Sequence, residues 1–266
     1  MENFFNKLVE FFEAQNIDRG LAIAYIIVSA LLGVMIVVAL IMRLIVVIRY
    51  FKSNRQTSST GMTSGQIARF VLDKNGLTDI QVQKSGFFRA WIFGNSYSPR
   101  TKTIYLRRTI WEKNSLTAIG IALQKVGVAK MCETGGKSVK VRYAFQVIGL
   151  FGPILLLPSI IIGFIIDIVV FHAIGVFTLA GIGLGLAIVV GGFIVTLLNI
   201  TIEKKANAMA LEMIDEAHYA SEEERATIKK LFDTYLIAYI CEFIVTILRI
   251  LQIVLEIVMR VQSSKK

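Results

Sequence analysis

The residues that most often carry metal or nucleophilic chemistry are few in this chain. There are two histidines, His172 and His218, and two cysteines, Cys132 and Cys241. The cysteines lie far apart without C-x-x-C spacing, which is typical of reduced thiols in the cytosol or membrane. His218 lies in an acidic helical segment, which favours a solvated surface histidine. No Ser/His/Asp or Cys/His catalytic arrangement can be assembled from these residues.

Asp167 is the ionisable residue that lies well inside a long apolar run. An acid within a membrane span is a functional hypothesis by default, and it would be the basis of a small transporter or channel component. Asp167 lies only about one helical turn from the outer end of its run, however. Interfacial snorkelling or capping is therefore the favoured interpretation.

Composition places these residues in a membrane protein. Hydrophobic residues make up 55% of the 266-residue chain and charged residues only 18%, a balance typical of proteins that cross a bilayer. Three apolar runs, at residues 21–42, 146–171 and 174–200, exceed the roughly 20 residues that a helix needs to span the hydrocarbon core. We therefore expect three spans, the last two forming a transmembrane hairpin.

Two amphipathic segments flank these spans. Residues 1–19 gather several phenylalanines on one side, which predicts an interfacial helix. Residues 236–260 carry Glu242, Arg249 and Glu256 at seven-residue spacing, and therefore on one helical face. This last segment is either a fourth span with its charged face packed against other helices, which is favoured, or an amphipathic helix in the interface.

The distribution of charge predicts an orientation. Residues 51–143 contain 16 Lys/Arg and 4 Asp/Glu, a net charge of +12. The positive-inside rule places this segment and residues 201–235 in the cytoplasm and the N-terminus outside, in a multi-pass protein of the cell membrane. This bias and attraction to anionic lipid explain the basic charge, so we expect no nucleic-acid partner.

The segment between the first two spans is expected to form a small mixed domain. Its predicted elements are a helix, two strands and a second helix, at residues 64–74, 79–83, 102–106 and 115–132. In the first helix Ile67, Phe70 and Val71 are expected to face inward. The cluster Asn95–Pro99 is predicted to be the turn before the second strand.

Separated motifs in this domain match a known family in order and spacing. They are Ser64–Arg69, Leu72–Asp73, Asn75–Val82, Tyr97–Lys102, Ser115–Ala118 and Ile202–Ala206. This set resembles the YugP-type membrane zinc metallopeptidases, in which a strand opens with Y-D-P-R-T-K and the third metal ligand lies in a V-E-F-D-A-S segment. The resemblance covers about residues 64–258, including the order of the spans.

The expected fold is an α-helical integral membrane protein with a small α+β metallopeptidase-like cytosolic domain. Three spans are followed by a C-terminal helix that is amphipathic or forms a fourth span. The expected parts are an interfacial helix, a first span, the cytosolic domain, a transmembrane hairpin, a helical segment completing the domain and a C-terminal membrane helix, at residues 1–19, 20–50, 51–143, 144–200, 201–235 and 236–260.

The chain departs from the family at the zinc-binding motif. Where the family has H-E-V-G-H, this chain reads Gln124-Lys125-Val126-Gly127-Val128. In H-E-x-x-H helices the two histidines hold zinc and the glutamate is the general base. Gln124 offers a weak neutral oxygen, Val128 offers none, and Lys125 places a cation where the base should be. Of the implied ligands Glu203 alone remains, so we expect no metal, no cofactor and no catalytic residue at these positions.

Glu203 then lacks the cation that neutralises the equivalent carboxylate in the family. An unpaired buried carboxylate is costly, so we predict that Lys125 supplies the counter-charge and Gln124 a further hydrogen bond. The plain alternative is a Lys125 side chain turned to solvent. Lys204 and Lys205 could also pair with Glu203, although neighbouring side chains on a helix point apart.

The sequence thus favours a pseudopeptidase, a protein-binding scaffold or regulator of a membrane protein complex rather than an enzyme. Its expected partners are membrane lipid and a protein in the membrane or at its cytosolic face, with a homo-oligomer as a further option. The aromatic residues Phe87, Phe88, Trp91 and Phe93 are either core and membrane-surface contacts or an edge strand that docks a partner. The alternatives are a membrane zinc metallopeptidase with a rebuilt site that acts on membrane proteins, and the transporter or channel component.

Overall fold

The structure is a computed structural model of the chain. It describes residues 2–135, 161–171, 175–217 and 219–263, and the single positions 141, 145 and 158. The chain divides into two compact units, one of residues 1–46 and 237–266 and the other of residues 47–236. The long helices α2 (Arg19–Asn54) and α9 (Glu222–Ser263) each contribute residues to both units.

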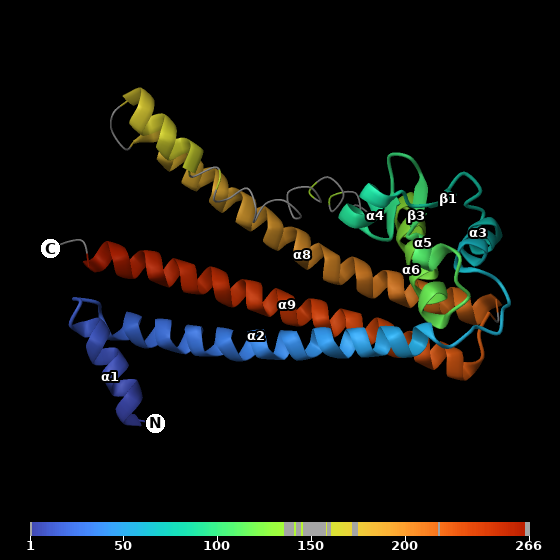
Figure 1. The fold of residues 1–266 in the computed structure, drawn as a ribbon, viewed down its shortest axis with the longest axis horizontal. Coiled ribbons are helices and arrows are strands. Elements are labelled where there is room, and N and C mark those ends of the chain that lie inside the picture. Colours follow the sequence, from blue (N-terminus) through green and yellow to red (C-terminus); the bar gives the residue numbers. More distant parts are fainter. Residues whose placement is uncertain are drawn as a thin grey trace. The chain divides into compact units, whose positions relative to one another are not determined.

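The first unit contains α1 (Glu2–Glu13) and the parts of α2 and α9 that lie within it. Ile17, Ala22 and Met259 form a small buried cluster there. Along α2 and α9, which run side by side in this unit (Figure 1), Arg43 and Glu242 form an ion pair at 2.9 Å. One residue of the charged face of the C-terminal helix thus pairs with α2, through side chains that are both exposed.

Among the described residues, three helices are long and apolar enough to cross a membrane: Arg19–Asn54, Val176–Glu216 and Glu222–Arg260. They contain most or all of the predicted spans 21–42 and 174–200 and of the C-terminal segment 236–260. The predicted span 146–171 falls largely outside the described residues, and its described part is the short apolar helix Ile161–Phe171.

The second unit contains a three-stranded sheet with strand order β1-β3-β2. β1 (Gln81–Lys84) is parallel to β3 (Thr103–Leu106), and β2 (Ser96–Ser98) is antiparallel to β3. β1 and β3 confirm the two predicted strands, with β1 shifted toward the C-terminus. The Asn95–Pro99 cluster was expected to be only a turn, and this is wrong because three of its residues pair with β3.

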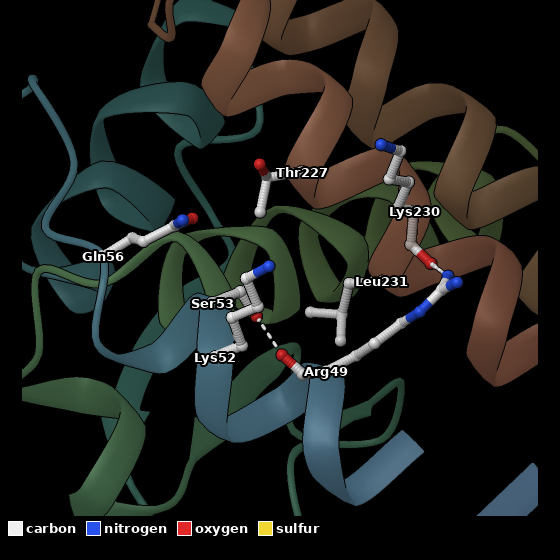
Figure 2. A pocket seen from close by; sticks show the side chains of 7 residues that line it. All are labelled: Arg49, Lys52, Ser53, Gln56, Thr227, Lys230 and Leu231. Atoms are coloured by element: carbon white, nitrogen blue, oxygen red, sulfur yellow. Dashed lines mark hydrogen bonds between the residues drawn. The ribbon is translucent and has the colours of Figure 1, made fainter. Parts of the chain in front are cut away.

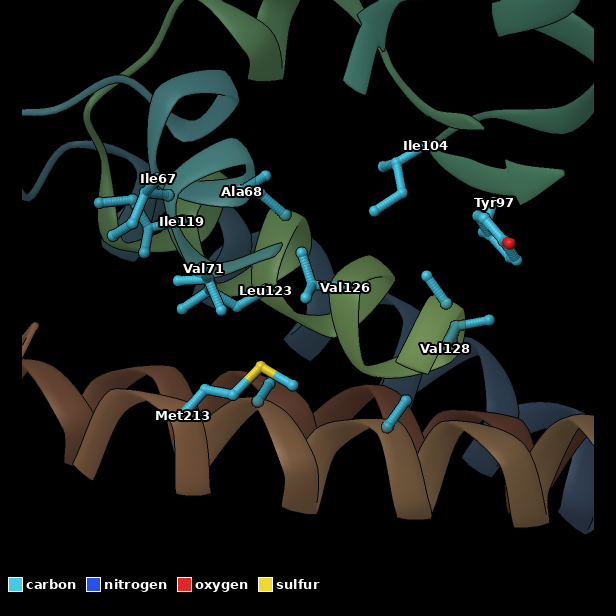
Figure 3. Close-up of a cluster of buried hydrophobic side chains, with 14 of the residues drawn as sticks. Ile67, Ala68, Val71, Tyr97, Ile104, Ile119, Leu123, Val126, Val128 and Met213 are labelled. Carbon is cyan, nitrogen blue, oxygen red and sulfur yellow. The ribbon is translucent and has the colours of Figure 1, made fainter. Parts of the chain in front are cut away.

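The α+β domain also contains helices α3 (Ser64–Lys74), α5 (Arg108–Trp111) and α6 (Leu116–Glu133). α3 and α6 confirm the two predicted helices. α3 starts with a capping box between Thr63 and Gln66. α6 is apolar on nearly all sides, which is typical of a buried helix, and it lies at the centre of the core (Figure 3).

One inward position in α3 was predicted wrongly. Ile67 and Val71 are buried, whereas Phe70 is exposed. Residues 67, 68, 71 and 72 fill the buried face of the helix, which leaves Phe70 at its margin. There its ring meets the ring of Tyr219 edge-on, with centroids 5.7 Å apart.

The aromatic run Phe87–Phe93 forms helix α4, so the predicted edge strand is wrong. Gly86 precedes the helix in an extended conformation, and Gly94 ends it with a positive φ of 61° that suits glycine. In a helix, residues 87, 88 and 91 lie on one face instead of alternating between two faces. The consequence is a single exposed aromatic face.

Asp167 caps the N-terminus of α8 (Val176–Ala217). Its side chain is buried, and its carboxylate accepts backbone N–H groups of Gly175 at 2.9 Å, Phe177 at 3.2 Å and Thr178 at 2.7 Å. A carboxylate is well suited to the unpaired N–H groups and positive dipole end of a helix. Of the two favoured interpretations, snorkelling or capping, the structure shows the cap, which gives this acid a structural explanation.

Candidate functional site

The candidate site lies where α6 crosses α8, and Gly127 permits the close approach of the two helices. A Cβ atom at Gly127 would lie 2.9 Å from the carbonyl oxygen of Ala206 and 3.3 Å from Cβ of Met209. Without that atom, α6 brings Gln124 and Lys125 next to Glu203, which α8 carries. The two segments that the sequence resemblance singles out are therefore neighbours in space.

Gln124 binds two residues of α8 through its side-chain amide. Its Nε2 donates to Oε2 of Glu203 at 2.5 Å and to Oδ1 of Asn207 at 2.7 Å. All three side chains are buried. Both amide hydrogens of Gln124 are thereby used, since an amide nitrogen has two to donate.

Lys125 supplies a positive charge to the same carboxylate. Its Nζ lies 3.6 Å from Oε1 of Glu203, and the two side chains are only 12% and 7% exposed. Lys204 and Lys205 are both exposed. Glu203 thus has an amide donor on one oxygen and a cation near the other, and both groups come from α6.

Asn207 is a member of this cluster that the sequence analysis did not identify. It follows Glu203 by four residues on α8 and therefore lies on the same face of the helix. That spacing was the signal that could have found it. Its side-chain oxygen accepts the second hydrogen of the Gln124 amide, which fixes the orientation of that amide.

Val128 belongs to the hydrophobic core. It is 1% exposed and lies in the buried cluster with Tyr97 and Ile104 (Figure 3). A metal ligand at this position would have to direct a polar atom toward Glu203, whereas the isopropyl group of Val128 has none. The packing around it is that of an ordinary apolar core residue.

The residues at the α6–α8 crossing do not fit a zinc ion. Zinc in proteins is held by thiolate, imidazole or carboxylate, and this cluster provides one carboxylate, two amides and an ammonium. The ammonium beside Glu203 would also repel a divalent cation. Within the described ranges, no group of three or more His, Cys, Asp or Glu residues is placed to hold a metal.

Two residues weighed in the sequence analysis, His172 and His218, lie outside the described residues. Cys132 and Cys241 are both buried. Cys132 lies in the core cluster of the second unit, whereas Cys241 lies in the part of α9 that belongs to the first unit. The two thiols therefore lie in different units.

The aromatic residues of α4 divide into two groups. Phe87, Phe88 and Trp91 are 80%, 78% and 77% exposed. Phe93 is half-buried, and its ring lies 5.5 Å from the guanidinium carbon of Arg89, which also lies 3.7 Å from the centre of the Tyr105 ring. Arg89 therefore anchors α4 on the sheet, while the first three rings form the aromatic face (Phe87, Phe88 and Trp91).

Comparison with known proteins agrees with these features. A match to the family described as "Putative neutral zinc metallopeptidase" covers residues 26–258. The chain therefore belongs to this family, and it is a homologue of membrane zinc metallopeptidases.

A curated relative is "Putative membrane protease YugP" of Bacillus subtilis (strain 168). It is 22% identical over 208 residues, which are 77% of this chain and 84% of the relative. No solved structure matches the chain. The resemblance to the YugP-type family seen in the sequence motifs is thus confirmed.

Proposed function

We propose that this protein is a catalytically inactive member of its family, which acts as a scaffold or regulator within a membrane protein complex. The observation that supports this most directly is the Gln124–Glu203–Asn207 hydrogen-bond cluster with Lys125 beside it. Hydrolysis by this family's chemistry needs two imidazole ligands and a carboxylate base on α6. Here the same helix carries an amide, an ammonium and a core valine.

Zinc content and hydrolysis test the loss of activity. We expect the wild-type protein, purified in mild detergent and incubated with zinc, to retain far less than one zinc per chain and to leave peptide substrates intact. The matched variant combines Gln124→His, Lys125→Glu and Val128→His, which restores the ligand types of the family to α6 beside Glu203. It is expected to gain zinc. Stoichiometric zinc or metal-dependent cleavage in the wild-type protein would contradict the proposal.

The aromatic face of α4 is the proposed docking surface for a protein partner. Large aromatic side chains dominate the energetics of protein interfaces, and three such rings are close to fully exposed on one short helix. Docking would use a helix face, and not the strand edge that the sequence analysis considered.

Photo-crosslinking in cells tests this surface. A photoreactive phenylalanine analogue at position 88 is expected to form protein adducts that mass spectrometry can identify. The same analogue at position 70, an exposed aromatic position elsewhere in the domain, is the matched control. Adducts with lipid alone at position 88 would show that the face contacts the membrane and would remove the support for a docking surface.

A peptidase with a rebuilt site is the second candidate, and membership of a zinc metallopeptidase family favours it. Its ligands would have to come from outside the Gln124–Val128 segment. The zinc measurement on the wild-type protein separates this candidate from the scaffold. The transporter alternative has less support, because Asp167 is engaged in capping α8.

A further inference from the structure

A polar cavity of about 320 Å³ lies between the end of α2 and the beginning of α9, within the second unit. α2 contributes Arg49, Lys52 and Ser53, Gln56 follows the end of that helix, and α9 contributes Thr227, Lys230 and Leu231. Figure 2 shows these side chains surrounding the space. The cavity is separate from the Gln124–Glu203–Asn207 cluster and shares no lining residue with it.

The lining carries three positive charges and no carboxylate. In the described part of the chain, no ion pair includes Arg49, Lys52 or Lys230. Arg49 Nη1 donates to two neutral oxygens of α9, the carbonyl of Lys230 at 3.0 Å and Oγ1 of Thr234 at 2.5 Å. Three cations that line one pocket without an acid repel one another, and an anion would relieve this repulsion.

The donor groups of the cavity suit a phosphate. A guanidinium held in place by its neighbours offers further N–H groups in a fixed plane, and lysine ammonium groups bind phosphate oxygens as point charges. Thr227 and Gln56 add a hydroxyl and an amide to the wall. The volume is at the small end of the range for ligand sites, roughly 300–1,000 Å³, so it accommodates a headgroup-sized molecule and not an acyl chain.

The position along the helices places such a ligand close to the lipid headgroups. Arg49 directly follows the apolar residues 44–48 of a candidate span, and the apolar part of α9 begins at Leu236, soon after Lys230. Basic residues at the end of an apolar helix lie at the level of the headgroups. We propose that this cavity, the Arg49–Lys52–Lys230 pocket, binds the phosphate group of an anionic ligand.

This proposal does not depend on the proposed function. A phosphate group can come from an anionic phospholipid or from a soluble phosphate compound, and the two sources need separate measurements. In the first, full-length protein is reconstituted in nanodiscs of equal parts phosphatidylglycerol and phosphatidylcholine, and native mass spectrometry records the lipid that stays bound. In the second, calorimetry measures binding of inorganic phosphate and of glycerol phosphate in neutral detergent.

The test variant is Lys52→Gln with Lys230→Gln, because neither ammonium group makes a described hydrogen bond that the fold requires. The control is Arg55→Gln with Lys229→Gln, which removes the same charge from exposed positions of the same region outside the pocket. We expect the test variant to bind at least about tenfold more weakly, as loss of charge-assisted hydrogen bonds implies. The control should bind within about twofold of the wild type, because screened surface charges contribute little.

Each outcome decides the proposal. Selective retention of phosphatidylglycerol that the test variant loses supports a lipid headgroup as the ligand. Binding of inorganic phosphate or glycerol phosphate, lost in the same variant, supports a soluble ligand. Absence of binding in both measurements, or equal losses in the test and control variants, would overturn the proposal.

Discussion

At the residue scale, Glu203 shows how protein groups can satisfy a buried carboxylate. One carboxylate oxygen accepts a hydrogen bond from Gln124, and the other lies 3.6 Å from the Lys125 ammonium. Removing two charges from water is costly, and their attraction offsets that cost only when further hydrogen bonds satisfy both groups. Asn207 contributes by holding the Gln124 amide in the orientation that serves Glu203.

Replacement of Lys125 by alanine should therefore destabilise the protein more than replacement of Lys204 by alanine. Breaking a buried pair by removing one partner costs about 3–5 kcal/mol, and some residual exposure places Lys125→Ala near the lower end. Lys204 is exposed, so its loss should change the unfolding free energy by less than about 0.5 kcal/mol. Denaturant unfolding in detergent measures both. Combining Lys125→Ala with Glu203→Gln should recover part of the lost stability. Equal melting temperatures for Lys125→Ala and Lys204→Ala would show that Lys125 does not stabilise Glu203.

The exposed ion pair between Lys102 and Asp79 in the α+β domain is expected to stabilise the fold in a way that depends on pH in the acid range. The hydrogen bond from Lys102 holds the pKa of Asp79 below its ordinary value, against a smaller opposing effect of burial. A carboxyl group with a lowered pKa in the folded state stabilises the fold above its unfolded pKa of about 3.9. This contribution is lost as the pH falls through the folded pKa. Asp79→Asn should thus reduce the decline in melting temperature between about pH 5 and pH 3, and an unchanged acid-side slope would refute this assignment.

At the scale of elements, the crossing of α6 and α8 depends on one missing side chain. Gly127 lies against the backbone of α8, where the nearest atom is a carbonyl oxygen that cannot move without moving the helix. The segments on either side of the crossing carry every residue of the candidate site. The close approach at Gly127 therefore underlies both the contact between α6 and α8 and the candidate site.

Gly127→Ala should destabilise the second unit by about 1–3 kcal/mol, the usual cost of overpacking a core. The matched control is Gly192→Ala on α8, where a Cβ atom would meet nothing within 4 Å. That change should be neutral or slightly stabilising, because alanine favours helix by up to about 1 kcal/mol over glycine. Thermal unfolding, monitored by circular dichroism, compares the Gly127→Ala and Gly192→Ala variants. A stabilised Gly127→Ala variant would show that the helices are not held this close in solution.

At the scale of the whole molecule, the apolar helices and the basic α+β domain differ in the surroundings in which their surfaces are stable. Apolar side chains dominate the surfaces of the three candidate spans, and a helix of that kind is stable in a bilayer, where its backbone groups are satisfied internally. The domain between the first two predicted spans contributes most of an apolar core that also includes residues of α8 and α9. Its net positive charge is the feature that predicts which side of the membrane it occupies.

Cysteine accessibility tests this orientation. In a background with Cys132→Ala and Cys241→Ala, Arg100→Cys is expected to resist a membrane-impermeant maleimide in intact cells and to react after permeabilisation. Arg100 is exposed in the domain, so the reagent can reach it once it is on the same side. A thiol placed ahead of α1 should show the opposite pattern. Labelling at position 100 from outside intact cells would reverse the predicted topology.

The sequence by itself determined the features that depend on local patterns. Uncharged runs predicted the long apolar helices, helical patterns and turn residues predicted α3 and α6, and the position of Asp167 within its run favoured snorkelling or a cap. Spaced motifs predicted the family and directed attention to Lys125 and Glu203. Each of these signals is carried by residues close together in the chain, or by a pattern that local geometry maps directly onto one element.

Only the tertiary structure decided the features that depend on contacts between distant segments. Ser96–Ser98 became a strand because β3 pairs with it, and Phe70 was left exposed because its neighbours fill the face of α3. The aromatic run became a helix anchored by Arg89 on the sheet. Asn207 was not predicted because its partner Gln124 lies 83 residues away in the sequence, and the crossing of α6 and α8 brings the two together. Such contacts depend on how the helices and strands pack together, and a single sequence does not contain that information in its local pattern.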